Sequence, residues 1–87
     1  MLSRELTIKD EEGLQSKPAA LLVQIACRYM CNIWIEQGSK RVNAKSIMGV
    51  LSLRLKKGDS FFIVVSGDDE QKAVDTIVKL IQTGSAE

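Results

Sequence analysis

Soft nucleophiles are scarce in this chain of 87 residues, which holds two cysteines and no histidine. Without imidazole the protein has no histidine base, histidine metal ligand or histidine phosphoryl acceptor. This excludes His-based triads, phosphohistidine relays and most zinc enzymes. Cys27 and Cys31 lie four residues apart, and no second cysteine pair completes a metal site. We expect both thiols to be reduced and buried in the core, and we expect no metal and no cofactor.

The balance of charge and the distribution of apolar residues exclude further classes of function. The 12 Lys and Arg residues are offset by 11 Asp and Glu residues, for a formal net charge of +1. Such a chain creates no field that attracts nucleic acid or an anionic membrane. Basic groups at residues 40–45 and 54–57 lack interleaved aromatic residues, which favours solvated faces. No stretch resembles a signal peptide or a membrane span, so we expect a cytoplasmic protein.

Hydrophobic periodicity in the first half of the chain predicts four elements. Leu6 and Ile8 alternate with polar residues, as in a half-buried strand over residues 2–9. Helical spacing then begins behind Ser16 as a cap, and it predicts a helix over residues 17–28 whose apolar stripe reaches Met30. Alternation resumes at residue 31, and the Gln-Gly-Ser turn at residues 37–39 predicts a β-hairpin.

The second half of the chain predicts three more elements. Ser46 precedes apolar residues at helical spacing, which extend to Leu55, and residues 56–59 carry the Lys and Gly that typically close a helix. Residues 60–66 are apolar, aromatic and β-branched, as in a buried strand. Asp68 or Asp69 then caps a last amphipathic helix, and residues 83–87 form a loose tail.

The element order β-α-β-β-α-β-α and the short chain together determine the expected fold class. A chain of 87 residues has enough apolar material for one core, so we expect a single domain over residues 1–87. Short strands with hairpin and helix connections predict an α+β fold, with a four-stranded antiparallel sheet and the helices packed on one face. Composition and periodicity alone leave the function open.

Two segments carry a more specific signal, namely residues 13–20 (GLQSKPAA) and 42–49 (VNAKSIMG). They resemble the signature segments of the HPr family, the small phosphocarriers of the bacterial sugar phosphotransferase system. In that family Gly-Leu-His-x-Arg-Pro-Ala precedes the first helix and Asn-x-Lys-Ser-Ile-Met-Gly precedes the second. The spacing between the segments and the Gly-Asp-Asp-Glu run at residues 67–70 also agree. The resemblance covers nearly the whole chain and implies an open-faced β-sandwich with three helices on one side of the sheet.

The chain departs from the family pattern at two positions. Gln15 stands where the family has its phosphoryl-accepting histidine, and a carboxamide has no basic nitrogen that could hold a labile phosphoryl group. Phosphocarrier chemistry of the usual kind is therefore excluded. Glutamine there, with an intact Ser46 segment, resembles the Crh type of HPr-like protein found in bacilli. Lys17 replaces the family arginine, so an anion site that relies on this residue loses the bidentate grip of a guanidinium.

Ser46 has a local interpretation and a functional one. As a helix cap its hydroxyl would contribute about 1 kcal/mol. The resemblance implies that HPr kinase/phosphorylase phosphorylates this serine with ATP, and that the product is a corepressor of catabolite control protein A, a LacI-type transcription factor. A helix N-terminus tolerates the added charge, so the fold would be kept while the surface changes.

The resemblance also implies a binding surface and an oligomeric state. The residues that match the family's docking surface are Gln15, Lys17, Ala20, Ser46, Ile47, Met48 and Leu51. Core packing is an equally good explanation for Met48. Trp34 is expected on the open face of the sheet, either half-covered by its neighbours or in an oligomer contact. Crh-type proteins exchange their first strand in dimers, which directs attention to a hinge at residues 10–13.

We therefore expect a non-enzymatic regulatory protein that HPr kinase/phosphorylase modifies at Ser46 and that then binds catabolite control protein A. Two alternatives remain open. The protein could be an unmodified scaffold or inhibitor that occupies the partners of HPr. It could also be a phosphotransferase component with a non-histidine acceptor, for which Cys27 and Cys31 are the soft nucleophiles.

Overall fold

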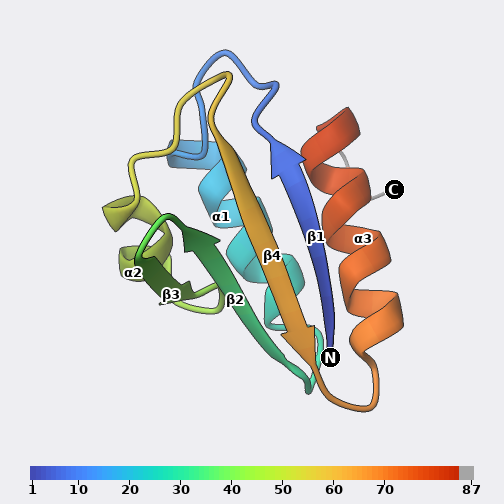
Figure 1. Ribbon diagram of the computed structural model, residues 1–87. Helices are drawn as coiled ribbons and strands as arrows, with labels where there is room; N and C mark the ends of the chain where they lie inside the picture. The colour runs from blue at the N-terminus through green and yellow to red at the C-terminus, as the bar shows by residue number, and fades with distance from the viewer. Residues whose placement is uncertain (85–87) are drawn as a thin grey trace.

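The elements follow one another in the predicted order. The computed structural model describes residues 1–84. Its elements are β1 (Leu2–Thr7), α1 (Ser16–Ala26), β2 (Asn32–Gln37), β3 (Lys40–Asn43), α2 (Ile47–Ser52), β4 (Ser60–Ser66) and α3 (Glu70–Thr83) (Figure 1). The strands form an antiparallel sheet in the order β1-β4-β2-β3. The expected α+β class with a four-stranded antiparallel sheet is confirmed.

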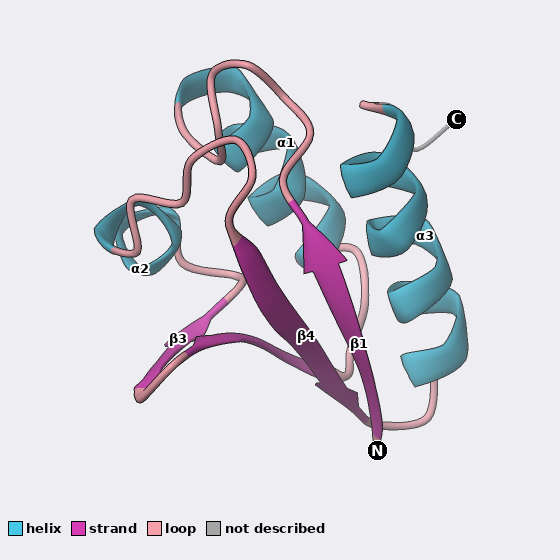
Figure 2. Cartoon of the chain, turned by 45° about the horizontal axis from the view of Figure 1, so that its top comes forward, coloured by secondary structure: helices cyan, strands magenta, loops and turns pink. Residues whose placement is uncertain are grey.

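The core lies between the sheet and the helices, which Figure 2 shows on one side of the strands. Alternate residues of the central strands face this layer, and the pairs Ile35–Ile63 and Ile33–Val65 are at most 1% exposed. The helices contribute Ala19, Leu22, Ile25, Val50, Ala73, Val74, Ile77 and Leu80. Burial of each large aliphatic side chain contributes about 1.5–3 kcal/mol. This period-2 and period-3.6 packing explains why the sequence pattern predicted the elements.

The opposite face of the sheet is open and carries Trp34, as expected. The Trp34 side chain is half-buried, and the Arg41 guanidinium lies 4.3 Å from its ring centroid. Arg41 is held there by an ion pair with Glu36 at 3.0 Å. Phe62, on the same face, is 45% exposed, so the expectation of a wholly buried fourth strand is wrong at this position. Local packing accounts for the half-covered tryptophan, and a contact between protomers at Trp34 stays a prediction.

The first helix begins and ends differently from the prediction. Gln15 occupies the N-cap position, and Ser16 is the first residue of α1. No side-chain cap hydrogen bond is present at this end of the helix. The φ angle of Ser16 is 51°, in the left-handed region. Just before the helix, the Leu14 N–H donates a hydrogen bond to the Leu55 carbonyl at 2.9 Å, and this bond fixes the loop that leads into α1. Met30 lies beyond the end of the helix and is 91% exposed, so its expected place in the apolar stripe is wrong.

The second helix is shorter than predicted. It ends at Ser52, and Arg54 takes a left-handed conformation with a φ angle of 51°. Leu55 lies outside the helix and is fully buried, and its carbonyl accepts a hydrogen bond from the Leu14 N–H in the loop before α1. The residues expected to close the helix form a separate turn, in which the Lys56 N–H donates to the Asp59 carboxylate at 2.8 Å and the Asp59 N–H returns to the Lys56 carbonyl.

Asp69 occupies the N-cap position of α3, but its side chain does not cap the helix. The carboxylate instead accepts hydrogen bonds from the backbone N–H groups of Met30, at 2.8 Å, and Cys31, at 2.9 Å. The turn before α3 is thereby tied to the segment between α1 and β2. The prediction that Asp68 or Asp69 begins the helix is confirmed at Asp69, but the expected side-chain cap is wrong, because the N–H groups of Met30 and Cys31 bind the Asp69 carboxylate instead.

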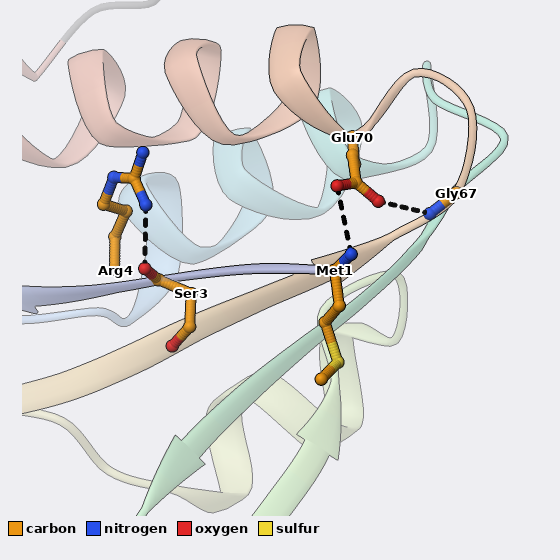
Figure 3. Close-up of polar contacts among 5 residues, drawn as sticks. All are labelled: Met1, Ser3, Arg4, Gly67 and Glu70. Carbon is orange, nitrogen blue, oxygen red and sulfur yellow. Dashed lines mark hydrogen bonds and ion pairs between the residues drawn. The ribbon is translucent and has the colours of Figure 1, made fainter.

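Glu70 ties the start of β1 to the same turn, although the sequence places it on the solvated face. One carboxylate oxygen accepts from the Gly67 N–H at 3.0 Å, and the other lies 3.1 Å from the Met1 amino group. Figure 3 shows Glu70 between these two partners, above the beginning of β1. The first strand is thus held by its hydrogen bonds to β4 and by an ion pair at its N-terminal end.

Both carboxylates make the stability of the fold depend on pH. Hydrogen bonds from the Met30 N–H lower the pKa of Asp69, and those from the Gly67 N–H and the N-terminal amine lower the pKa of Glu70. A lowered pKa contributes stability that is complete above the ordinary carboxyl range and is lost as the pH falls through the folded value. We expect the urea midpoint of unfolding to decline below about pH 4.

The Asp69→Asn variant checks this expectation with the same urea titrations. It should be less stable than the wild type at neutral pH and should lose less stability on acidification, because the titrating carboxylate is gone. Parallel curves for the two proteins between about pH 6 and about pH 2 would contradict the role of Asp69.

The last helix extends one residue into the predicted tail. Thr83 is helical, and Gly84 ends the helix in the left-handed region, with its N–H on the Leu80 carbonyl at 2.7 Å. Residues 85–87 of the predicted tail lie outside the described residues. Within residues 1–84, no helix has the length and apolar character needed to cross a bilayer.

Candidate functional site

Ser46 occupies the N-cap position of α2. Its backbone is extended, with φ −111° and ψ 116°, and its Oγ accepts a hydrogen bond from the Gly49 N–H at 3.2 Å. The side chain is exposed. The local prediction of a capping serine is confirmed, and the hydroxyl is also accessible from solvent.

The turn that leads into α2 is held by several hydrogen bonds. The Asn43 side chain accepts from the Lys45 N–H at 2.8 Å, and the Asn43 carbonyl accepts from the Ser46 N–H at 3.1 Å. Ala44 is fully buried, and its N–H donates to the Ile33 carbonyl at 2.9 Å. The Lys45 amino group donates to the carbonyl of Tyr29 at 2.7 Å. Ser46 therefore follows a turn that is held by hydrogen bonds of both its backbone and its side chains.

Two large apolar side chains lie exposed directly after Ser46. Ile47 is 39% exposed and Met48 is 76% exposed, whereas Val50 is fully buried. Leu51 is half-buried and packs against the core. Core packing is therefore the wrong explanation for Met48. The hydroxyl of Ser46 borders a small apolar surface that is open to a partner.

The predicted residues of the first signature segment lie at the N-terminal end of α1. Gln15 and Lys17 are exposed and Ala20 is half-buried. Gln15 makes no side-chain cap hydrogen bond to the helix. Its carboxamide therefore does not cap α1, although it occupies the histidine position of the family motif at the start of this helix.

Contacts link the α1 region to the segments on both sides of α2. Leu14 pairs with Leu55 at the N-terminal end of α1, beyond the end of α2, whereas the Cys27 thiol points to the Lys45 carbonyl at 3.9 Å at the other end. The structure thus brings the two groups of predicted residues onto neighbouring helices (Figure 1).

The two cysteines differ in their surroundings. Cys27 is exposed at the C-terminal end of α1, so the expectation that both thiols are buried is wrong for this residue. Cys31 is buried, and burial together with a hydrogen bond to the Asp69 carboxylate raises its pKa to about 11. At neutral pH the Cys31 thiol therefore stays protonated and is a poor nucleophile. Cys27 lies at the opposite end of α1 from Gln15.

Thiol alkylation of the native protein checks this difference. We expect iodoacetamide to modify Cys27 and leave Cys31 unmodified at neutral pH, because the thiolate is the reactive species and Cys31 is shielded. Peptide mass spectrometry assigns the modified residue, and alkylation in denaturant serves as the control for complete reaction. Equal modification of the two thiols in the native state would contradict the buried position of Cys31.

A pocket beside Lys17 could not be read from the sequence. Its volume is about 400 Å³, and it lies between the loop after β1, the first turn of α1 and the last turn of α3. Lys17, Pro18 and Leu21 line one wall and Leu80 another. Asp10 and Glu12 border the same space as the lysine, so the pocket has no uniform charge. No sequence signal marks it, because its walls come from two segments, residues 8–21 and 80–84, that lie far apart in the chain.

Comparison with known proteins identifies the family. The family model "PTS HPr component phosphorylation site" matches residues 2–83. The chain belongs to the HPr family. The resemblance inferred from the two signature segments is thereby confirmed.

Relatives of the HPr family include proteins of the Crh type. The HPr-like protein Crh of Halalkalibacterium halodurans is 42% identical over 82 residues, which cover 94% of this chain and 98% of that protein. A crystal structure of HPr from Thermoanaerobacter tengcongensis superimposes with a TM-score of 0.95 and 41% identity, over 100% of this chain and 98% of that one. A crystal structure of Crh of Bacillus subtilis, described as a dimer with a swapping domain, has a TM-score of 0.77 and 36% identity over 98% of each chain.

Proposed function

We propose that this protein is a regulatory HPr-like protein of carbon catabolite repression that acts as a single domain and has no catalytic activity of its own. HPr kinase/phosphorylase would phosphorylate Ser46 with ATP, and the product would bind catabolite control protein A as a corepressor. The observation that carries the proposal is an exposed Ser46 hydroxyl beside the exposed Met48 side chain, in a chain with glutamine at position 15. The similarity to Crh of other bacteria supports the same role.

Phosphorylation at Ser46 suits the local structure. A phosphate adds about −2 charge, which the N-terminal end of a helix favours, and its oxygens can accept the Gly49 N–H in place of the hydroxyl. Met48 then lies next to a concentrated negative charge. A partner with an Arg or Lys pocket beside an apolar groove would bind this form and not the unmodified one.

Gln15 supports a regulatory role over a carrier role. The carrier reaction needs a nucleophilic nitrogen that holds the phosphoryl group and releases it again, and the glutamine amide nitrogen is not basic. In the family-derived docking surface, Gln15, Lys17 and Ala20 would contact the partner next to the α2 residues Ile47, Met48 and Leu51.

We also propose a homodimer formed by exchange of β1, as the swapped dimer of Bacillus subtilis Crh suggests. Within the described residues β1 pairs with β4 alone. An exchanged strand can form the same pairing with the β4 of a second copy. The hinge would be the turn at residues 10–13, where Asp10 accepts the N–H groups of Glu12 and Gly13. Size-exclusion chromatography with light scattering over a range of concentrations tests this, and a monomer at every concentration would contradict it.

Mass spectrometry of the intact protein tests the main proposal. One sample is incubated with ATP and HPr kinase/phosphorylase, and a parallel sample with phosphoenolpyruvate and the enzyme that charges HPr. An HPr with its histidine is the positive control in both. We expect one phosphate from ATP, mapped to Ser46, and none from phosphoenolpyruvate. The absence of added phosphate in both samples would favour the unmodified scaffold, and a phosphate from phosphoenolpyruvate would favour a non-histidine acceptor.

A further inference from the structure

We infer that Lys45 is a positioning residue for Ser46, which it holds by tying the preceding turn to the C-terminal end of α1. The inference rests on the proposed phosphorylation of Ser46. Lys45 is half-buried, and its amino group donates to the Tyr29 carbonyl at 2.7 Å. Tyr29 follows the last turn of α1, and its N–H donates to the Ala26 carbonyl. A cation is favourable there, because the C-terminal end of a helix carries partial negative charge.

The carbonyl that Lys45 binds is itself fixed by contacts with α3. The Tyr29 hydroxyl is hydrogen-bonded to the Thr76 hydroxyl at 2.7 Å. The next two backbone N–H groups along the chain, of Met30 and Cys31, both donate to the Asp69 carboxylate. The hydrogen bond from Lys45 to the Tyr29 carbonyl therefore links the turn before α2 to a segment that is itself fixed to α1 and α3.

Lys45 and Ser46 are neighbours in the chain but have different partners. The lysine amino group is bound to Tyr29, whereas the serine Oγ accepts from Gly49 and is exposed. The Lys45 ammonium group thus holds the turn through Tyr29, and it leaves the Ser46 hydroxyl accessible to a kinase. Lys45 acts on the reaction through the position of the serine and not through contact with the phosphoryl donor.

Phosphorylation kinetics and amide hydrogen exchange of matched variants test the inference. Lys45→Met removes the ammonium group and keeps the aliphatic stem, and Lys79→Met on the exposed face of α3 is the control with the same change in charge. We expect Lys45→Met to lower kcat/KM for Ser46 by about tenfold, the size of effect of one lost charge-assisted hydrogen bond. Protection of the Ser46 and Gly49 amides should fall in the same variant, and both quantities should stay at wild-type values in Lys79→Met.

Lys45→Arg keeps a donor for the Tyr29 carbonyl and should retain the protection and most of the kinetics of the wild type. The inference is overturned if Lys45→Met is phosphorylated as fast as Lys79→Met, or if Lys45→Arg is as slow as Lys45→Met. A slow Lys45→Met with unchanged amide protection would overturn it as well, because the lysine would then contact the kinase directly. Absence of phosphorylation in the wild type would refute the proposed function instead. Exchange of the Ser46 and Gly49 amides would then still show whether the hydrogen bond from Lys45 to Tyr29 holds the turn.

Discussion

Replacement of Ser46 by alanine is expected to abolish phosphorylation by HPr kinase/phosphorylase and, with it, binding to catabolite control protein A. The methyl group has no oxygen that could attack ATP. The fold should persist, because the substitution removes a single cap hydrogen bond to the Gly49 N–H, worth about 1 kcal/mol. Intact mass after incubation with ATP and the kinase measures the first effect, calorimetric titration with the repressor measures the second, and thermal unfolding verifies the fold.

A matched control is available in the same helix. Ser52 is exposed, and its hydroxyl donates to the Gly49 carbonyl at 2.6 Å. Ser52→Ala should therefore be phosphorylated and should bind the repressor like the wild type. Ser46→Asp should bind only weakly, because an aspartate carries one negative charge against about two for a phosphate and has planar geometry. Repressor binding by unphosphorylated Ser46→Ala at wild-type phosphoprotein strength would refute the charge-gated switch.

Replacement of Gly13 by alanine is expected to destabilise the protein by about 3 kcal/mol, the largest stability effect we predict. Gly13 has a φ angle of +71°, which L residues with a side chain rarely adopt. A Cβ at this position would clash with the carbonyl oxygen of Leu55 and lie 3.0 Å from the Cα of Lys56. Both contacts are with backbone, so the new methyl group cannot be accommodated by a side-chain rotation. Urea unfolding followed by circular dichroism measures the loss.

Gly38→Ala separates the two causes of this effect. Gly38 has a φ angle of +59°, but a Cβ there would meet nothing within 4 Å. The variant should lose only about 1 kcal/mol, from backbone strain alone. Equal losses of unfolding free energy in the Gly13 and Gly38 variants would show that the close approach of Gly13 to the backbone of Leu55 and Lys56 contributes nothing.

Gly13 also lies at the hinge proposed for strand exchange. The alanine variant penalises the closed turn at residues 10–13, in which the Gly13 N–H donates to the Asp10 carbonyl at 3.0 Å. The same chromatography and light scattering that test the homodimer should show a higher dimer fraction for Gly13→Ala than for Gly38→Ala. A change in the opposite direction would argue against a hinge at this turn.

Local patterns along the chain were sufficient to predict most of the secondary structure. β4 (Ser60–Ser66) begins and ends at the predicted residues, because its apolar and β-branched composition is a property of the strand itself. Ser46 was predicted to be a cap, and it is one, because the serine and the N–H that it accepts are three residues apart. The motif around Ser46 and the glutamine at position 15 likewise stand in the sequence without reference to any other part of the chain.

Competition between distant groups explains the predictions that were wrong. The side chain of Asp69 was expected to cap α3, but it binds two N–H groups 38 and 39 residues away. α2 was expected to continue to residue 55, but Leu55 pairs with the loop before α1. In both cases a polar group has more than one possible partner, and only packing of the helices on the sheet decides which partner lies within hydrogen-bonding distance.

The fold class, the family and the chemical character of the site could be predicted from the sequence, because these depend on periodicity and on motifs within eight consecutive residues. The exposure of individual side chains and the contacts that support them follow instead from how the elements pack. Exposure of Met48 and Cys27, and the tether from Lys45 to Tyr29, depend on how α1, β3 and α2 pack against one another. That packing arises from contacts summed over the whole core, which no short segment encodes alone.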